Sequence, residues 1–236
     1  MWYSYFFGLQ KKYNMRISKK EPLVIRLDGQ NVTKNKTINL IDDYNKSFYN
    51  AMRDAAWYFS KKYDCYSIFG SDEISFIITE PLSIIEEYSP DDKSDYSNEI
   101  TSLFSQYFFD YFNSLYNENK IFWHAKSFSI PKEKINSYVK YRSNIIENVL
   151  TTYFLIREQS FVPNVKLEDN RKKCLQNKDF LSLKNRVKGE LYFSGEKIDL
   201  EKFIQDNKVE KIKEFKQIDN NVENSTDILI DIDIDL

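Results

Sequence analysis

The order in which hydrophobic periodicity changes along the chain constrains the fold more than any other feature of the sequence. Short aliphatic runs predict strands, and apolar residues spaced three and four apart predict amphipathic helices. The expected elements are, in order, a strand at 21–29, a helix at 42–61, a hairpin within 63–78 that turns at Gly70-Ser71, a helix at 97–116, a strand at 121–131 and a helix at 133–158. This βαββαβ order is typical of a ferredoxin-like sheet, an α/β (α+β) architecture, and we expect the helices to lie on one face of that sheet.

Composition indicates a chain with ample material for a hydrophobic core. The 236 residues are 42% hydrophobic and 16% aromatic. Two cysteines, Cys65 and Cys174, and one histidine, His124, are too few for a disulfide framework or for a zinc site of the usual Cys and His ligands. No apolar run approaches the ~18 residues of a membrane span, and the N-terminus does not resemble a signal peptide. We therefore expect no membrane association and a cytosolic location, with a mitochondrial one left open.

Charge is strongly segregated although the net charge is only −2. Residues 1–20 contain five basic and no acidic side chains, and residues 166–188 contain eight basic and three acidic ones. Together these segments would suit a polyanion such as a nucleic acid. Each segment alone is equally consistent with a solvated helix face, so both interpretations stay open.

The C-terminal part of the chain differs from the rest. We expect a catalytic domain with helical additions over 1–195 and a charged extension over 196–236. The last ten residues, 227–236, largely alternate Asp and Ile, which is the period of a strand with one wet face. This tail is predicted either to be a disordered acidic end or to add as a strand to an exposed sheet edge.

Acidic residues stand at two strand ends of the expected sheet. Asp28 ends the first strand, and Asp72 and Glu73 lie in the hairpin. Because these strands are neighbours in a βαββαβ sheet, the carboxylates are expected to converge on one edge, where they repel each other unless a cation lies between them. Such oxygen ligands suit Mg²⁺ held together with substrate phosphates, and a pair of ions ~3.5–4 Å apart is the usual clamp for nucleotidyl transfer. The alternative is two ordinary turns, since Asp-Gly and Gly-Ser are common turn pairs.

One arginine interrupts an apolar helix stripe. On the helix at 133–158, the stripe that includes Tyr138, Val139 and Ile146 also contains Arg142. A guanidinium on an apolar face needs an acceptor, either a triphosphate or an inward carboxylate. The alternative is a side chain that reaches out to a surface carboxylate.

Several motifs in a fixed order resemble one enzyme family. The segments "VIRLDGQ" and "GSDEISF" are similar to the strand end and hairpin of the tRNA-histidine guanylyltransferase family and its 3′–5′ polymerase relatives. Three further segments continue the resemblance in the family's order: "NEITSLFSQYF" at 98–108, "SYVKYRS" at 137–143 and "KGELYF" at 188–193.

The resemblance implies a polymerase palm that adds nucleotides to the 5′ end of tRNA, with two Mg²⁺ ions and with ATP and GTP or other nucleoside triphosphates as substrates. It implies metal ligands at Asp28, Asp72 and the Gly29 carbonyl, with Glu73 beside them in the catalytic set. The implied nucleotide-binding residues are Gly29, Gln30, Asn31, Ser71, Arg142 and Lys188. Relatives are often tetramers, so a homo-oligomer, tetramer or dimer, is expected.

Departures from the family pattern concern the RNA. Lys126 stands where the family has arginine, and the helix after Arg142 has no histidine in its expected stretch, where Asn148 lies near a family position. These differences favour the like-protein branch, which repairs truncated 5′ ends by templated addition, over guanine addition to tRNA-His. The residues predicted to contact tRNA are Lys126, Asn148, Arg171, Lys172, Lys173 and Arg186.

Two rival functions stay open. A palm-type nucleotidyl cyclase or oligonucleotide synthase has a Gly-Gly-Asp-Glu hairpin that "GSDE" resembles, and it would form cyclic or oligomeric products without RNA. A non-catalytic tRNA-binding palm would have no need for Asp28 and Asp72.

Overall fold

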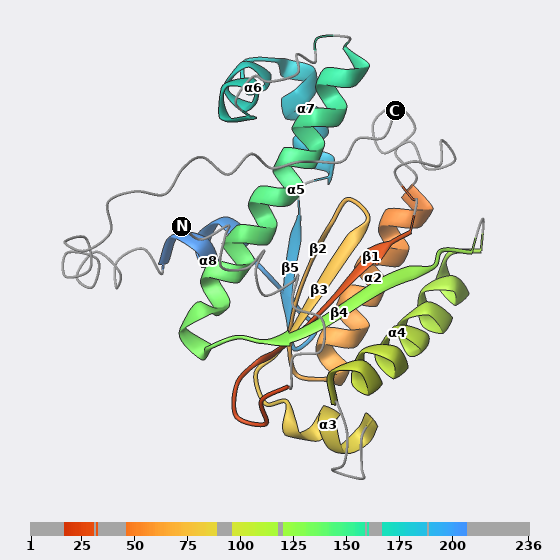
Figure 1. Cartoon of the computed structure of the whole chain (residues 1–236). Helices are drawn as coiled ribbons and strands as arrows, with labels where there is room; N and C mark the ends of the chain where they lie inside the picture. Colours follow the sequence, from red (N-terminus) through yellow and green to blue (C-terminus); the bar gives the residue numbers. More distant parts are fainter. Residues whose placement is uncertain are drawn as a thin grey trace, which may run out of the picture.

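The computed structural model describes residues 17–30, 32, 46–88, 96–117, 120–158, 160, 167–187 and 189–206 (Figure 1). The strands are β1 (Leu23–Gly29), β2 (Tyr66–Gly70), β3 (Glu73–Ile78), β4 (Trp123–Ser129), β5 (Glu190–Phe193) and β6 (Glu196–Ile198). The helices are α2 (Lys46–Lys62), α3 (Leu82–Tyr88), α4 (Tyr96–Leu115), α5 (Ile135–Arg157), α6 (Leu167–Cys174), α7 (Lys178–Val187) and α8 (Leu200–Asp206), with a short 3₁₀ turn η1 (Lys132–Lys134) before α5.

The strands form one antiparallel sheet in the order β4-β1-β3-β2-β5-β6. Its first four strands and the helices α2 and α4 confirm the βαββαβ order expected from the sequence. The sheet continues with β5 and β6, which pair with each other across a tight turn at Ser194-Gly195. The domain boundary predicted after residue 195 therefore falls between two paired strands of one sheet.

Helices cover both faces of the sheet, so the expectation of helices on one face was wrong (Figure 1). On one face, α2 and α4 pack an aromatic core in which Phe59 and Phe76 meet Phe104 and Phe108 with ring centroids 5.3–5.9 Å apart. On the other face, α5 packs over the sheet with Tyr138 and other apolar side chains. Every residue of β3 is buried, including Glu73 and Ser75 on the face toward α5, which is the result of cover on both faces of the sheet.

The last part of α5 runs beyond the sheet to α6 and α7 (Figure 1). These three helices share a small separate core, made of Leu150, Phe154, Leu155, Cys174, Phe180 and Leu183. We refer to this part, from Glu147 to Val187, as the helical extension. It corresponds to the helical additions expected from the sequence.

Several sequence predictions lie outside the described residues. They are the basic segment up to residue 16, Asn31, Lys188 and the tail 227–236, and the side chain of Arg186 is likewise not described. Among the described residues, no helix is long and apolar enough to cross a membrane. Cys65 and Cys174 are both buried free thiols, and burial raises the pKa of each above its usual value.

Candidate active site

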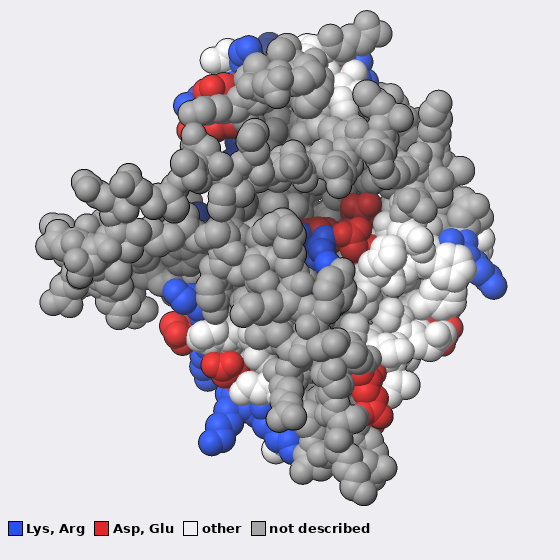
Figure 2. Space-filling model, viewed as in Figure 1, with Lys and Arg blue, Asp and Glu red and all other residues white. Residues whose placement is uncertain are grey.

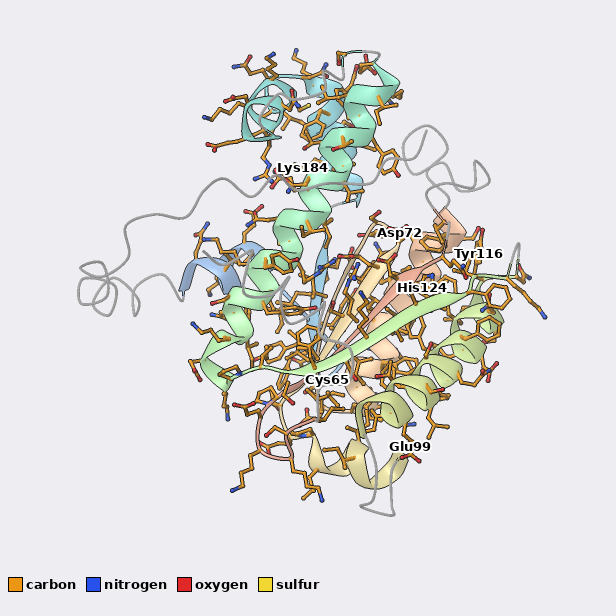
Figure 3. The ribbon with its side chains drawn as sticks, viewed as in Figure 1. Cys65, Asp72, Glu99, Tyr116, His124 and Lys184 are labelled. Atoms are coloured by element: carbon orange, nitrogen blue, oxygen red, sulfur yellow. The ribbon has the colours of Figure 1, made fainter. Side chains whose placement is uncertain are left out.

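Strand register places the predicted acidic residues in one row across the sheet. Asp28 in β1 is the direct partner of Glu73 in β3 and, on its other side, of His124 in β4. Direct cross-strand partners point to the same face, so these three side chains lie on the face covered by α5. Asp72 lies in the turn next to this row, and Figure 3 shows Asp72 and His124 at the same end of the sheet. The predicted convergence of Asp28, Asp72 and Glu73 is therefore present in the structure.

The end of β1 is joined to the hairpin through the main chain. The Gly29 amide donates a hydrogen bond to the Asp72 carbonyl at 2.8 Å, and the Gln30 amide donates to the Phe122 carbonyl at 2.7 Å. A Cβ at position 29 would lie 2.6 Å from Val32 Cγ2 and 3.3 Å from the Asp72 carbonyl oxygen. Glycine at this position is what lets the Asp28 and Asp72 segments approach each other.

The hairpin turn is one residue later than predicted. Gly70 still pairs with Glu73, so Ser71 and Asp72 are the two turn residues, and Ser71 has a positive φ of 56°. The lack of a side chain at Gly70 makes room for α5, because a Cβ there would lie 2.6 Å from Ile146 Cγ2.

Asp72 is poorly neutralised by its surroundings. Burial and, secondarily, the nearby negative charge of Asp28 raise the pKa of Asp72 to about 6. The Ser71 hydroxyl donates a hydrogen bond to Asp72 Oδ1 at 2.9 Å, which opposes part of this rise. Among the ion pairs of the described residues, none involves Asp72. A buried carboxylate in this condition favours a nearby cation.

Glu73 is held by two arginines. Arg142 Nη2 donates to Glu73 Oε1, and Arg26 Nη2 donates to Glu73 Oε2 at 2.8 Å. Arg142 is 2% exposed and Glu73 8%, so the buried arginine has an inward carboxylate as its acceptor and does not reach the surface. Burial and the charge of Arg26 lower the pKa of Arg142 below its usual range, and the direct contact with Glu73 favours the charged form.

Arg26 is the residue that the sequence analysis missed. Its Nη2 also donates to Asp28 Oδ2, so one nitrogen bridges Asp28 and Glu73. In the sequence, Arg26 is simply a polar position in a strand motif. The signal that could have identified it is period-2 alternation, which places Arg26 on the same face as Asp28. The sequence analysis considered His124 only as a zinc ligand, although the same alternation places it beside Asp28.

The predicted tRNA contacts lie in two separate places. Lys126 is the β4 partner of Arg26, next to the acidic row. Arg171 in α6 donates to the Asn148 side chain in α5 and lies 3.9 Å from Glu147, so part of its charge is already engaged. The other two described basic residues of this set, Lys172 and Lys173, are exposed on α6. On the face drawn in Figure 2, acidic as well as basic side chains occur over α6.

The donor set at the hairpin fits Mg²⁺. Asp28 and Asp72 supply carboxylates, and the Gly29 carbonyl lies at the same strand end. Within the described residues no three His, Cys, Asp or Glu side chains form a complete metal-binding group. Mg²⁺ is commonly held by only one or two carboxylates together with waters and substrate phosphates. Figure 2 shows acidic and basic side chains adjoining near the middle of the face over β1 and β3.

The fold is shared with known proteins. Three solved structures have the same fold: a bacterial tRNA(His) guanylyltransferase (Thg1)-like protein in complex with GTP (16% identity, TM-score 0.57), the like-protein in complex with ATP (16%, 0.56), and tRNA(His) guanylyltransferase from Saccharomyces cerevisiae (18%, 0.53). The bacterial structures are covered over 80% of both chains, and the yeast structure over 81% of this chain and 93% of its own. No curated protein matches the sequence.

At the level of the sequence, a family model described as tRNAHis guanylyltransferase (Thg1) matches residues 7–132, which is just over half of the chain. The matched span includes β1, the β2–β3 hairpin and β4, and therefore Asp28, Asp72 and Glu73. This protein belongs to the tRNAHis guanylyltransferase (Thg1) family, whose members are nucleotidyltransferases.

Proposed function

We propose that this protein is a Mg²⁺-dependent 3′–5′ nucleotidyltransferase that adds nucleotides to the 5′ end of tRNA. The observation that carries the proposal is the pair Asp28 and Asp72, brought together at one strand end by the Gly29–Asp72 backbone hydrogen bond. Membership of the family supports the reaction class. The like-protein structures with GTP and ATP support nucleoside triphosphates as substrates.

In this proposal each residue of the site has a separate task. Asp28, Asp72 and the Gly29 carbonyl would hold Mg²⁺. When bound, the metal lowers the pKa of the incoming nucleotide's 3′-hydroxyl and neutralises charge on the phosphates. Ser71 keeps the Asp72 carboxylate oriented through its hydrogen bond. Glu73, fixed by Arg142 from α5, anchors the hairpin at the edge of the site.

The reaction requires a nucleophile and an electrophile in line. The 3′-hydroxyl of the incoming nucleotide attacks the 5′-phosphorus of the tRNA, which is activated either as an adenylate or as a triphosphate. The new phosphodiester bond forms as the bond to AMP or pyrophosphate breaks, and the hydroxyl proton is released. A site that positions carboxylates and cations around phosphates acts mainly by orientation and charge stabilisation.

The decisive test is Asp72→Asn with a 5′-labelled tRNA that lacks its first residue. The variant should lose addition by at least about 10³-fold, which is the scale expected when charge stabilisation of a transition state is removed. Asp110→Asn, on the outer surface of α4, is the matched control and should be fully active. Normal addition by the Asp72 variant would contradict the metal assignment.

The same assay separates templated repair from guanine addition. We propose templated repair, as in the like-protein branch, so the added nucleotide should change when the opposing 3′ nucleotide of the tRNA is changed. Addition of guanine whatever the template would favour the other branch. Cyclic or oligomeric nucleotides formed without RNA would instead identify a cyclase.

The proposal also includes a homo-oligomer, dimer or tetramer, and a cytosolic location. Sedimentation of the purified chain tests the oligomeric state, and fractionation of cells tests the location.

A further inference from the structure

Arg26 lies between two carboxylates with part of its donor capacity unused. It points from β1 to the face under α5, and its side chain is 16% exposed. Among the described residues its hydrogen bonds go to Asp28 and to Glu73, and both leave from Nη2. Its Nε is buried and has no hydrogen-bond partner among the described residues. A guanidinium has five N–H donors in a fixed fork, so Arg26 can donate hydrogen bonds to further oxygen atoms.

The charges of the site do not pair evenly. Glu73 pairs with both Arg142 and Arg26, whereas the ion-pair partner of Asp28 among the described residues is Arg26. Asp72 is left as the acid whose pKa is raised, in part by Asp28. Arg26 therefore neutralises one of the two carboxylates that would hold a metal ion.

A metal ion and Arg26 would compete for Asp28. Both are cations that use the same carboxylate oxygens, and two positive charges a few ångströms apart in a partly buried site repel strongly. When a divalent cation binds to Asp28, the ion pair with Arg26 becomes unfavourable. The guanidinium then needs another acceptor at the same place, and phosphate oxygens match its fork.

We propose that Arg26 holds Asp28 while the metal site is empty, and exchanges Asp28 for the phosphate chain of the nucleotide when metal and nucleotide bind together. This inference rests on the proposed function, because it takes Asp28 as a metal ligand. Lys126 in β4 is the cross-strand partner of Arg26, so it adds a second positive charge two residues along the strands from the Asp28–His124 pair. The exchange makes binding of the metal and of the nucleotide mutually favourable, so that the metal binds weakly on its own.

The test measures metal and nucleotide binding separately, without turnover. Mn²⁺ binding to the full chain is followed by electron paramagnetic resonance, with Asp72→Asn to identify the fraction bound at this site. Binding of Mg²⁺·GTP is followed by fluorescence. In Arg26→Gln the competing cation is gone, so Mn²⁺ alone should bind roughly tenfold more tightly, whereas Mg²⁺·GTP should bind roughly tenfold more weakly.

The control is Arg157→Gln, which removes the same charge from an arginine that pairs with Glu158 at the end of α5. Both affinities should stay as in the unmodified protein. Equal or weaker Mn²⁺ binding in Arg26→Gln would overturn the exchange, because a residue that only supports the fold cannot oppose metal binding. If the unmodified protein binds no Mn²⁺ at Asp72, the metal site itself is wrong. If Mn²⁺ binds there but Arg26→Gln does not strengthen it, only the exchange by Arg26 is wrong.

A conservative variant keeps the test valid if Arg26→Gln does not fold. Arg26→Lys retains the charge but loses the fork, so Mn²⁺ affinity should stay within about twofold, while Mg²⁺·GTP affinity should fall several-fold. Unchanged nucleotide affinity in Arg26→Lys would contradict the transfer of this side chain to phosphate.

Discussion

The carboxyl group of Asp72 predicts how metal binding depends on pH. Its pKa is raised to about 6 by burial and by Asp28, and only the ionised form binds a cation. Mn²⁺ affinity should therefore fall about tenfold per pH unit below pH 6 and level off above about pH 7, as titrations from pH 5 to 8 would show. Affinity that is constant across this range would contradict the assignment of Asp72 as a ligand.

The same carboxyl group predicts a gain in stability on mutation. Because the folded-state pKa lies above the ordinary value of 3.8, the folded protein binds more protons between about pH 4 and 6, and stability from this group is lost as pH rises through 6. Asp72→Asn should thus be more stable than the unmodified protein at pH 7.5 in EDTA, by up to about 3 kcal/mol. Thermal melts should show the difference vanishing near pH 3.5. A lower melting temperature for the variant at pH 7.5 would show that the ionised carboxylate of Asp72 does not destabilise the fold.

At the scale of single residues, the sequence predicted the acids better than their partners. Asp28, Asp72 and Glu73 could be found because carboxylates at strand ends are unusual in an apolar context. The bridging role of Arg26 depends on the register between β1 and β3, which local sequence does not encode. The acceptor of Arg142 was left open between a carboxylate and a triphosphate, and in the structure it is Glu73.

At the scale of elements, the contact between Gly70 and α5 predicts a specific coupling. A Cβ at Gly70 would meet three atoms of Ile146 at 2.6–3.0 Å, so Gly70→Ala should destabilise the fold by about 1–3 kcal/mol. Ile146→Ala opens that space at its own cost. In denaturant melts, the double variant should lose less stability than the sum of the losses in the two single variants. Simple additivity would show that α5 does not rest on this glycine.

A second coupling between elements is the attachment of α2 to β5. Glu190 is 7% exposed and accepts from Arg53 Nη2 at 2.9 Å, from the Tyr192 hydroxyl at 2.8 Å and from Lys197 Nζ at 3.1 Å. Burial acts to raise the pKa of Glu190, but these bonds outweigh it and hold the pKa below its usual value.

The resulting prediction concerns Glu190→Gln. The stability contributed by Glu190 is present above its unfolded pKa and is lost as pH falls through the lower folded value, so the variant should be less stable than the unmodified protein at pH 7. Denaturant melts at pH 7 and pH 3.5 should show the deficit shrinking at the lower pH. Glu196→Gln, an exposed acid on β6, is the control.

The sequence predicted the existence and type of most elements but not their faces. Apolar periodicity located β1, α2, the β2–β3 hairpin, α4, β4 and α5, because the period reports local backbone geometry directly, but it did not locate the short helix α3. It did not show that α5 crosses to the opposite face. The short strands β5 and β6 were not predicted, since four and three residues are too few to establish a period.

For the whole molecule, the distribution of exposed basic residues predicts where tRNA is held. Lys172 and Lys173 are exposed on α6, where Lys172 also lies 3.2 Å from Glu168, and Arg171 is engaged by Asn148. Lys172→Glu with Lys173→Glu should weaken tRNA binding and lower the slope of log affinity against log salt by about 2, with Mg²⁺·GTP binding unchanged. Lys202→Glu on α8 is the control, and an unchanged salt slope in the double variant would place the RNA elsewhere.

Helix α5 carries Arg142 at one level and Asn148 at another, and its sequence contains neither glycine nor proline. A helix without such residues has no evident hinge, so these two positions are separated by about 9 Å along a stiff rod. Helix α5 therefore holds the carboxylate end of the sheet and the helical extension at a fixed distance from each other. An RNA bound to the extension would place its 5′ end at a fixed distance from that contact. An RNA longer or shorter by one nucleotide would therefore put a different phosphate in the site.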